Sequence, residues 1–351
     1  MLLTTGKRAV GLVRQAILPT PFPGISSYLR RLGLMAALLP VLFVTQLING
    51  VGLLLDEILF PGYRRVAIRQ PVLVLGVPRS GTTFMHRLLA ADPGCTTFST
   101  WECLFAPSIV QRRFWHRLAA VDSLIGRPCG RLLAALERRM LAHTGGVHPT
   151  GLFEPEEDYW CFMPVLCCFI LVLPFPEADW LWRMARFDRD MPARERARHL
   201  RWYRNCLRRH LYFHGEDKRL VSKNASFAGM AASLVEEFPD CRLVICERER
   251  ESVIRSQFRS LEGAMRWCAI ARDDQRFRER LLGCIDFYYA NLERAAAALE
   301  PERLVRVPLE RLSADPRGIV REIGRRFGFG PARAVDGVIA ANEAERGLTS
   351  A

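Results

Sequence analysis

The chain has 351 residues, of which half are hydrophobic and a quarter are charged. This composition supplies a sizeable core and excludes a disordered or collagen-like chain. The formal net charge of +13 indicates an anionic partner, whether a phosphorylated cofactor, a sulfated or phosphorylated substrate, an anionic lipid or a nucleic acid, and does not choose among them.

Eleven cysteines lie mostly in apolar context, as in Cys167-Cys168, and no CxxC pair occurs. The pattern therefore lacks zinc-ribbon spacing and predicts small buried thiols in a reducing compartment. The one Asn-x-Ser/Thr sequon is Asn224-Ala-Ser226, and a glycan there would lie beside Lys223. Both observations predict a chain that faces the cytoplasm.

Residues 32–55 carry no charge. A stretch of this length is compatible with a buried or groove-lying helix, with a helix on a membrane surface, or with a single membrane span. Pro40 and Asn49 dilute its apolar character and leave all three open. We expect residues 1–60 to form an N-terminal extension that contains this apolar helix.

Further along the chain, short apolar runs alternate with amphipathic ones. Buried strands are predicted at 71–76, 219–223, 241–246 and 304–307, and helices follow them at 82–91, up to 237, 251–261 and 315–327. Alternation of this kind predicts an α/β fold with a central parallel sheet. We assign residues 61–335 to this domain, with a helical cap at about 105–215, and residues 336–351 to a C-terminal tail.

Within the cap, residues 183–209 combine ten arginines with interleaved aromatic residues. Such a stretch could bind an anion or a nucleic acid, although it more often forms a solvated helix face. His210 and His214 stand four residues apart, a spacing compatible with a metal site. No companion ligand is evident from the sequence, so we expect both to be helix-surface residues.

The most informative segment joins the first strand to its helix and reads Gly76-Val-Pro-Arg-Ser-Gly-Thr-Thr83. Its glycines permit a tight turn, its backbone N–H groups form an anion nest, and Arg79 adds a cation. The segment predicts a phosphate-binding loop that resembles a P-loop. It lacks the Gly-Lys-Ser/Thr motif of nucleotide triphosphatases, because no lysine directly follows Gly81. The cation of the loop, Arg79, precedes Gly81 by two residues instead.

Pro78-Arg-Ser-Gly-Thr-Thr83 resembles the 5′-phosphosulfate loop of sulfotransferases that use 3′-phosphoadenosine 5′-phosphosulfate (PAPS). The wider stretch from Leu55 to Glu102 is similar to a bacterial-type subgroup related to tyrosylprotein sulfotransferase. The resemblance implies a P-loop-like α/β fold. It also implies that Arg79, Ser80, Gly81, Thr82 and Thr83 bind the 5′-phosphosulfate.

A second motif supports the same family. Arg248 follows the predicted strand 241–246, and Ser256 lies eight residues later in the next helix. In sulfotransferases an arginine and a serine at this spacing hold the 3′-phosphate of PAPS, and a guanidinium is suited to bidentate phosphate binding. The family often has Arg-Asp-Pro where this chain has Arg248-Glu-Arg250, so the identity of the gripping arginine stays open among neighbouring arginines.

Two further residues receive catalytic roles from the resemblance. Lys223 matches a strand-end lysine that stabilises the transferring sulfonate, and it is one of only three lysines among 50 cationic residues. Glu102 matches the glutamate that takes the acceptor proton. The acidic run 154–158 and His86 provide the alternative bases Glu154, Glu156, Glu157 and His86.

The sequence thus predicts a PAPS-dependent sulfotransferase that moves a sulfonate to a hydroxyl, less favourably to an amine, without a metal. Its partner would be a small-molecule, lipid or glycan acceptor and not a nucleic acid, with residues 32–55 available to a membrane surface. The rival functions are a P-loop kinase, which lacks the required lysine and Mg²⁺-holding aspartate here, and a phosphate-ligand-binding, membrane-associated protein.

Overall fold

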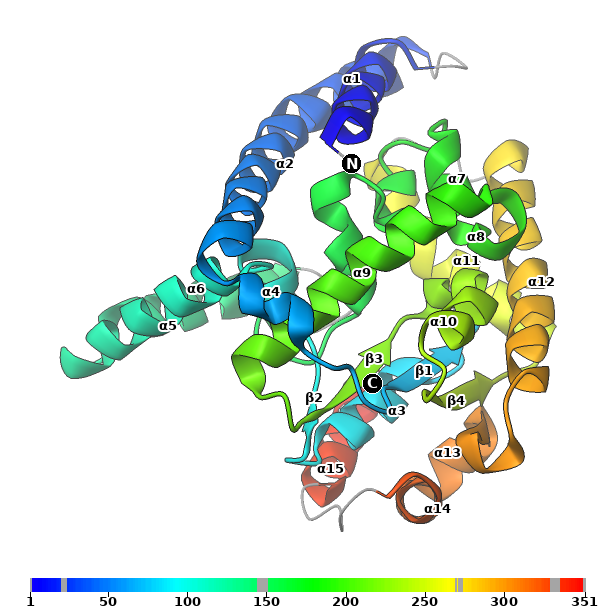
Figure 1. The fold of residues 1–351 in the computed structure, drawn as a ribbon. Coiled ribbons are helices and arrows are strands. Elements are labelled where there is room, and N and C mark those ends of the chain that lie inside the picture. Colours follow the sequence, from blue (N-terminus) through cyan, green and yellow to red (C-terminus); the bar gives the residue numbers. More distant parts are fainter. Residues whose placement is uncertain are drawn as a thin grey trace.

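A five-stranded parallel sheet organises the chain (Figure 1). The computed structural model describes residues 2–19, 24–143, 151–268, 270, 274–328 and 335–349. The strand order is β2-β3-β1-β4-β5, and every neighbouring pair is parallel. The strands are β1 (Val72–Gly76), β2 (Cys95–Thr96), β3 (Arg219–Lys223), β4 (Arg242–Glu247) and β5 (Leu304–Pro308). The predicted α/β fold with a central parallel sheet is therefore confirmed.

Alternate residues of each central strand enter different cores, as the two-residue period of a strand requires. In β1, Leu73 and Leu75 join the larger hydrophobic cluster, whereas Val72 and Val74 join the smaller one. The larger cluster contains residues of α10 (Ala231–Glu237), α11 (Arg250–Trp267) and α12 (Gln275–Ala297). The smaller cluster contains residues of α3 (Thr82–Ala90), α13 (Leu309–Ala314), α14 (Pro316–Phe327) and α15 (Val335–Thr349).

The chain leaves the sheet centre in two directions. From β1 it passes through α3 to the edge strand β2, whereas from β4 it passes through α11 and α12 to the opposite edge strand β5. Adjacent strands whose connections diverge leave a crevice at their carboxyl ends, where ligands of α/β proteins bind. This crevice lies between β1 and β4, the strands that precede Arg79 and Arg248.

The chain between β2 and β3 contains helices and 3₁₀ turns. They are α4 (Thr100–Phe105), α5 (Ile109–Leu124), α6 (Pro128–His143), η2 (Asp158–Val165), η3 (Phe169–Val172), α7 (Asp179–Ala185), α8 (Phe187–Asp190) and α9 (Ala193–His214). Three more 3₁₀ turns are η1 (Pro61–Arg65), η4 (Ala225–Met230) and η5 (Pro301–Arg303). Pro155 lies outside these elements and forms an isolated bridge with Ser99, three residues before η2 begins.

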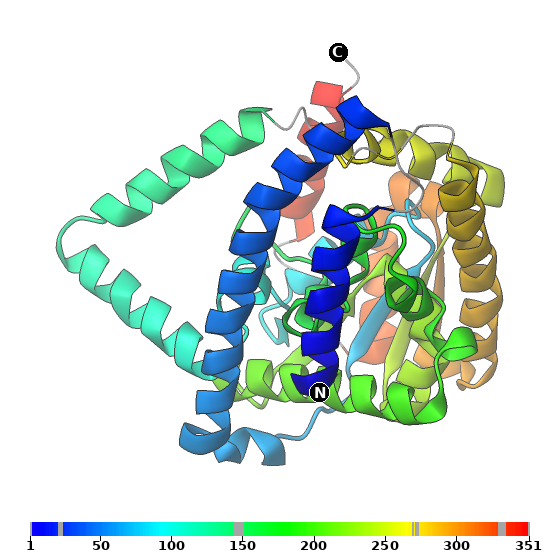
Figure 2. The same cartoon turned by 90° about the horizontal axis from the view of Figure 1, so that it is seen from above.

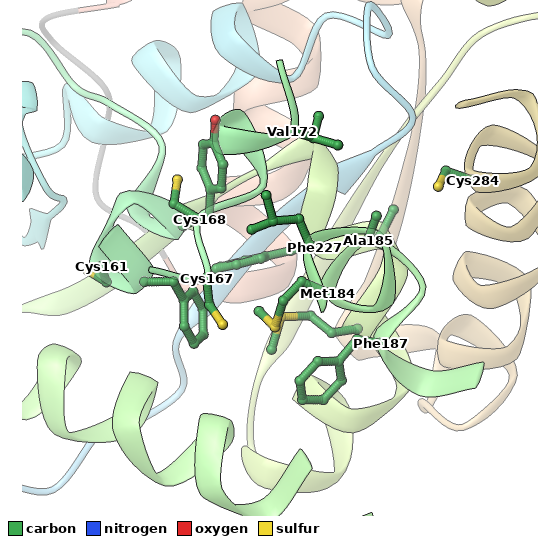
Figure 3. Close-up of a cluster of buried hydrophobic side chains, with 14 of the residues drawn as sticks. Cys161, Cys167, Cys168, Val172, Met184, Ala185, Phe187, Phe227 and Cys284 are labelled. Atoms are coloured by element: carbon green, nitrogen blue, oxygen red, sulfur yellow. The ribbon is translucent and has the colours of Figure 1, made fainter. Parts of the chain in front are cut away.

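Most of the thiols are core residues. All eleven cysteines are free, and nine of them are buried. Figure 3 shows Cys161, Cys167 and Cys168 among the hydrophobic side chains of the cap. Burial raises the pKa of the Cys167 thiol to about 12, so this group stays protonated and unreactive.

The N-terminal extension consists of α1 (Leu2–Ile17) and the 35-residue α2 (Ile25–Leu59), which lie along one side of the molecule (Figure 2). Leu12, Met35 and Leu42 belong to the larger core cluster, so the extension completes the core of the domain. Helix α2 is long and apolar enough to cross a membrane, and 22% of its most apolar window is buried. The tail predicted at 336–351 contains most of α15, whose Ile339 is buried in the smaller cluster.

The arginine-rich segment is not a uniformly solvated face. Phe187 and Tyr203 are fully buried, and Arg209 forms ion pairs with Asp56 and Glu57 of α2. This part of α9 therefore attaches the cap to the N-terminal extension.

Gly229 in η4 provides a test of the packing between the cap and α12. A Cβ atom there would overlap the carbonyl of Ala185 and lie 3.0 Å from Tyr288. Overpacking of a core costs about 1–3 kcal/mol, so we expect Gly229→Ala to lower the free energy of unfolding by at least that amount in urea denaturation. Gly283→Ala in α12, where nothing lies within 4 Å of the added Cβ, should stabilise the helix by roughly 0.5–1 kcal/mol. Equal effects of the two changes would contradict this packing.

Candidate active site

The loop after β1 folds back on itself. Gly76 ends β1 where any Cβ would lie 2.5 Å from Ser80 Oγ and 2.6 Å from the Cys246 carbonyl, so no side chain fits there. Gly81 and Arg79 both adopt left-handed backbone conformations, with φ of 89° and 67°. The buried Ser80 hydroxyl donates to the Val77 carbonyl at 2.7 Å. The loop is therefore compact, and Ser80 supports its shape from inside.

Two arginines and a serine meet on the β4 side of this loop. Arg79 Nε donates to Ser256 Oγ at 3.2 Å, and Arg248 Nη1 donates to the Arg79 carbonyl at 2.8 Å. Tyr289 donates to the Arg248 carbonyl at 2.7 Å and fixes the backbone there. Residues predicted from three separate positions of the sequence are thus brought together.

Both arginines of this cluster are without an acidic partner in the described part of the chain. Desolvation and the charge of Arg248 lower the pKa of Arg79. Among the residues that the structure describes, neither arginine forms an ion pair with a carboxylate. Two adjacent cations without a counter-charge form a site for an anion such as phosphate.

The structure distinguishes Arg248 from its neighbours. Arg250 pairs with Glu251 and with Asp286 of α12, and Arg255 donates to Ser252 Oγ, so both arginines are engaged away from the loop. Glu249 caps α11 by accepting from the N–H groups of Glu251 and Ser252. Of these three arginines, Arg248 is the one that contacts the loop.

On the β3 side of the loop stands a lysine–glutamate pair. The buried Lys223 donates to Glu157 Oε1 at 2.9 Å and to Thr83 Oγ1 at 3.3 Å. Thr83 lies in the first turn of α3, directly after the loop. Lys223 and Glu157 thus flank the phosphate-binding loop opposite the arginine cluster.

A buried network holds Glu157 in this position. Asp158, the next residue, accepts a hydrogen bond from the Tyr203 hydroxyl at 2.5 Å, which also contacts Ser222 Oγ at 2.9 Å. Ser222 precedes Lys223 on β3. The segment with Glu157 is therefore tied to the strand that carries Lys223.

Glu102 has quite different surroundings. It completes the capping box of α4, where its Oε2 accepts from the Ser99 N–H at 3.0 Å. Its Oε1 accepts from His214 Nε2 at 2.5 Å and lies 3.4 Å from Arg112 Nε. Burial alone would raise the pKa of this carboxyl, but Arg112 and the two histidines of α9 hold it well below its ordinary value. Both oxygens are engaged, which makes Glu102 a weak base.

The sequence predicted that the two histidines of α9 lie on the helix surface, and the structure shows that they do not. His210 is fully buried and contacts Thr96 Oγ1 at 2.8 Å, while His214 is partly buried. Glu102, His210 and His214 place three ligand atoms within 4.8 Å of one another, as a metal site requires. The buried guanidinium of Arg112 already supplies the positive charge of this group, and it opposes a divalent ion.

The remaining predicted bases are placed less favourably. His86 is fully buried against Thr97 Oγ1 at 2.6 Å, and burial lowers its pKa well below the usual range. Glu156 accepts from Thr100 Oγ1 at 3.3 Å, beside α4. Glu154 is exposed, and no contact of its carboxylate with Lys223 is found among the described residues. Glu157 is therefore the acidic residue that the structure joins to the loop.

Comparison with known proteins decides the family. Residues 71–330 match the sulfotransferase family. The chain belongs to this family. Two curated relatives, the omega-hydroxy-beta-dihydromenaquinone-9 sulfotransferases Stf3 of Mycobacterium bovis and Mycobacterium tuberculosis, are each 24% identical over 267 residues. The match covers 74% of this chain and 63% of those proteins, so the chain spans less than two thirds of their length.

Solved sulfotransferase structures share the fold. STF1 from Mycobacterium tuberculosis superposes with a TM-score of 0.70 at 22% identity, covering 97% of this chain and 87% of STF1. STF9 from Mycobacterium avium gives 0.68 at 16% identity, covering 97% and 82%. The similarity of fold extends over nearly the whole chain. The match to the family model confirms the predicted sulfotransferase family.

The buried carboxyl of Asp158 makes the stability of this chain depend on pH. Burial raises its pKa to about 7, despite the hydrogen bond from Tyr203. The folded chain then keeps a proton that the unfolded chain releases near pH 4, so this group lowers the free energy of unfolding as the pH rises between these values. When the pH is raised from about 5 to about 7.5, the free energy of unfolding should fall less in Asp158→Asn than in the wild type. We expect the two decreases to differ by more than about 1 kcal/mol.

Urea denaturation at several pH values measures this difference. Asp217→Asn, which changes an exposed aspartate, should keep the pH profile of the wild type. If all three proteins share one profile, Asp158 does not hold a proton in the folded state.

Proposed function

We propose that the chain transfers a sulfonate from PAPS to a hydroxyl group of its acceptor, less favourably to an amine. The observation that carries the proposal is the arrangement around the loop, with the Arg79–Arg248–Ser256 cluster on one side and the Lys223–Glu157 pair on the other. Sulfonate transfer needs both an anion site for the donor and a cation beside the reacting group. Family membership supports a sulfonate donor.

The donor side is formed by the loop and the arginine cluster. The loop amides at the start of α3, with Gly81, Thr82 and Thr83, would hold the 5′-phosphosulfate, and Ser80 would keep the loop in shape. Arg248 and Ser256 would hold the 3′-phosphate. Arg79, whose backbone belongs to the loop and whose side chain reaches Ser256, would link the two phosphate positions.

The transfer side is formed by Lys223 and a carboxylate. PAPS supplies the sulfonate, and the acceptor oxygen replaces the phosphate oxygen on its sulfur. Lys223 would neutralise the charge that develops on the departing phosphate oxygen. The carboxylate would take the proton that the acceptor hydroxyl loses. No residue role here requires a metal, because Arg and Lys side chains supply the positive charge.

We propose Glu157 as this proton acceptor. Its carboxylate is partly exposed and contacts Lys223. By contrast, both carboxylate oxygens of Glu102 already accept hydrogen bonds, one from the Ser99 N–H and one from His214. The assignment of the base to Glu102 remains a prediction of the family resemblance. The surroundings of Glu102 favour a structural role that attaches α4 to α9.

The acceptor class follows from a relative and from the surface. Stf3 is named for a menaquinone derivative, a lipid-like hydroxyl compound. We propose a lipid or other small-molecule hydroxyl as the acceptor of this chain and not a nucleic acid; a glycan is the remaining candidate. The active site would face the cytoplasm, since Asn224 of the sequon is fully buried and the thiols are free.

Binding of the product nucleotide tests the donor side. Adenosine 3′,5′-bisphosphate should stabilise the fold by about 2.7 kcal/mol at 100 times its Kd, and AMP should bind far more weakly because it lacks the 3′-phosphate. Arg248→Ala should weaken bisphosphate binding by about 2–3 kcal/mol. Arg250→Ala, which removes an ion-paired arginine of α11, should leave affinity unchanged. Equal affinities for AMP and the bisphosphate in calorimetry would reject the 3′-phosphate site.

Single-turnover kinetics with saturating PAPS test the transfer side. Lys223→Ala should lower the rate by about 10²–10³-fold, and Glu157→Gln by about 10²–10⁴-fold, with little change in PAPS affinity. Glu102→Gln should mainly reduce stability, because it weakens the cap of α4 and the contact with His214. The opposite result, a silent Glu157→Gln beside an inactive but folded Glu102→Gln, would return the base to Glu102.

A further inference from the structure

Helix α2 exposes an apolar face along most of its length. Val41, Val44, Leu47, Ile48, Val51, Leu54 and Ile58 are all exposed, and Leu47 is 69% accessible. Their spacing of three to four residues places them on one side of the helix. From Val41 to Ile58 this face extends about 26 Å, at 1.5 Å per residue. A continuous face of this size on a surface marks an interaction site.

The opposite face of α2 is fixed to the domain by buried polar contacts. Asp56 accepts from the N–H groups of Ile109 and Val110 at the start of α5 and pairs with Arg209 at 3.0 Å. Gln111 donates to the buried Asn49 at 2.8 Å. Burial raises the pKa of Asp56, although these hydrogen bonds and Arg209 oppose the rise. A helix that left this site to cross a bilayer would take an aspartate and an asparagine with it into lipid.

The helices α5 and α6 form an arm that projects beside α2 (Figures 1 and 2). The arm exposes both apolar and cationic side chains. The apolar ones include Phe114, Leu118, Leu124, Ile125 and Leu132. Arg117, Arg127 and Arg131 are exposed among them. Residues 1–31 contain five cationic residues and no acidic one, of which Arg8 and Arg31 are buried and the other three remain available to the surface charge.

We propose that the outer face of α2 and the α5–α6 arm dock together on the surface of an anionic lipid bilayer. Aliphatic side chains would enter the boundary between headgroups and acyl chains, and the arginines would contact anionic headgroups. The mixture of exposed apolar residues with unbalanced positive charge favours a lipid surface over a second copy of this chain. Two like-charged arms would repel each other. The docking is independent of the sulfonate transfer proposed above.

Vesicle flotation of the full chain tests this inference. The protein should float with vesicles of phosphatidylcholine and phosphatidylglycerol and bind vesicles of phosphatidylcholine alone much more weakly. Leu47→Glu combined with Val51→Glu should lower binding roughly tenfold or more, because both side chains are exposed and would carry charge into the bilayer. Leu47→Met combined with Val51→Ile keeps the face apolar and should bind as the wild type does. Arg117→Gln combined with Arg131→Gln should reduce binding to anionic vesicles only.

Three parallel measurements keep the outcome decisive. Bisphosphate binding should be the same in all variants, which shows that each is folded and separates this test from that of the enzyme activity. Resistance of the bound wild type to alkaline carbonate extraction would mean that α2 spans the bilayer and would overturn surface docking. A stable dimer in sedimentation that the Glu variant abolishes, without vesicle binding by the wild type, would assign the face to a second copy and would also overturn it.

Discussion

The contact between Arg248 and the main-chain carbonyl of Arg79 holds two like charges together at the centre of the molecule. Nothing in the local sequence of either residue favours such a pair, since two guanidinium groups repel each other. The pair exists because β1 and β4 are adjacent and parallel, with Gly76 beside Cys246, so that the loops following them emerge at the same edge. The strained backbone of Arg79 and the close fit around Gly76 also hold the loop against β4. The fold thus provides the energy that keeps a site for an anion ready before the anion arrives.

The local sequence pattern was sufficient to predict the strands, the loop and other features that depend on neighbouring residues. The segments that form β1, β3, β4 and β5 lie within a residue or two of their predicted positions. Each contains a short core of apolar, β-prone residues, which is typical of buried parallel strands. The loop and the spacing of Arg248 to Ser256 were recognisable for the same reason. The two-residue strand β2 was not, since it exists only through its pairing with Arg219 and Leu220 of β3.

Contacts between distant segments limited the prediction of the site. The family resemblance proposed Glu102 as a base, but Arg112 and His214, which engage its carboxylate, come from α5 and α9. Glu157 was only one of several acidic alternatives in a short run. Its contact with Lys223 depends on Tyr203, which lies 45 residues after Asp158 and joins it to Ser222 of β3. No periodicity encodes a bond of that kind.

The distribution of thiols has a practical consequence for spectroscopy. Cys129 is the exposed member of the eleven cysteines, and it lies at the start of α6, in the arm. Nine others are shielded by the core, and Cys268 is of intermediate burial. A maleimide fluorophore would therefore label the natural chain preferentially at the arm, without the removal of any cysteine. A hydrogen bond with Asp122 raises the pKa of the Cys129 thiol, so the labelling should accelerate at mildly alkaline pH. The emission colour of an environment-sensitive dye at this position would report the polarity that the arm encounters.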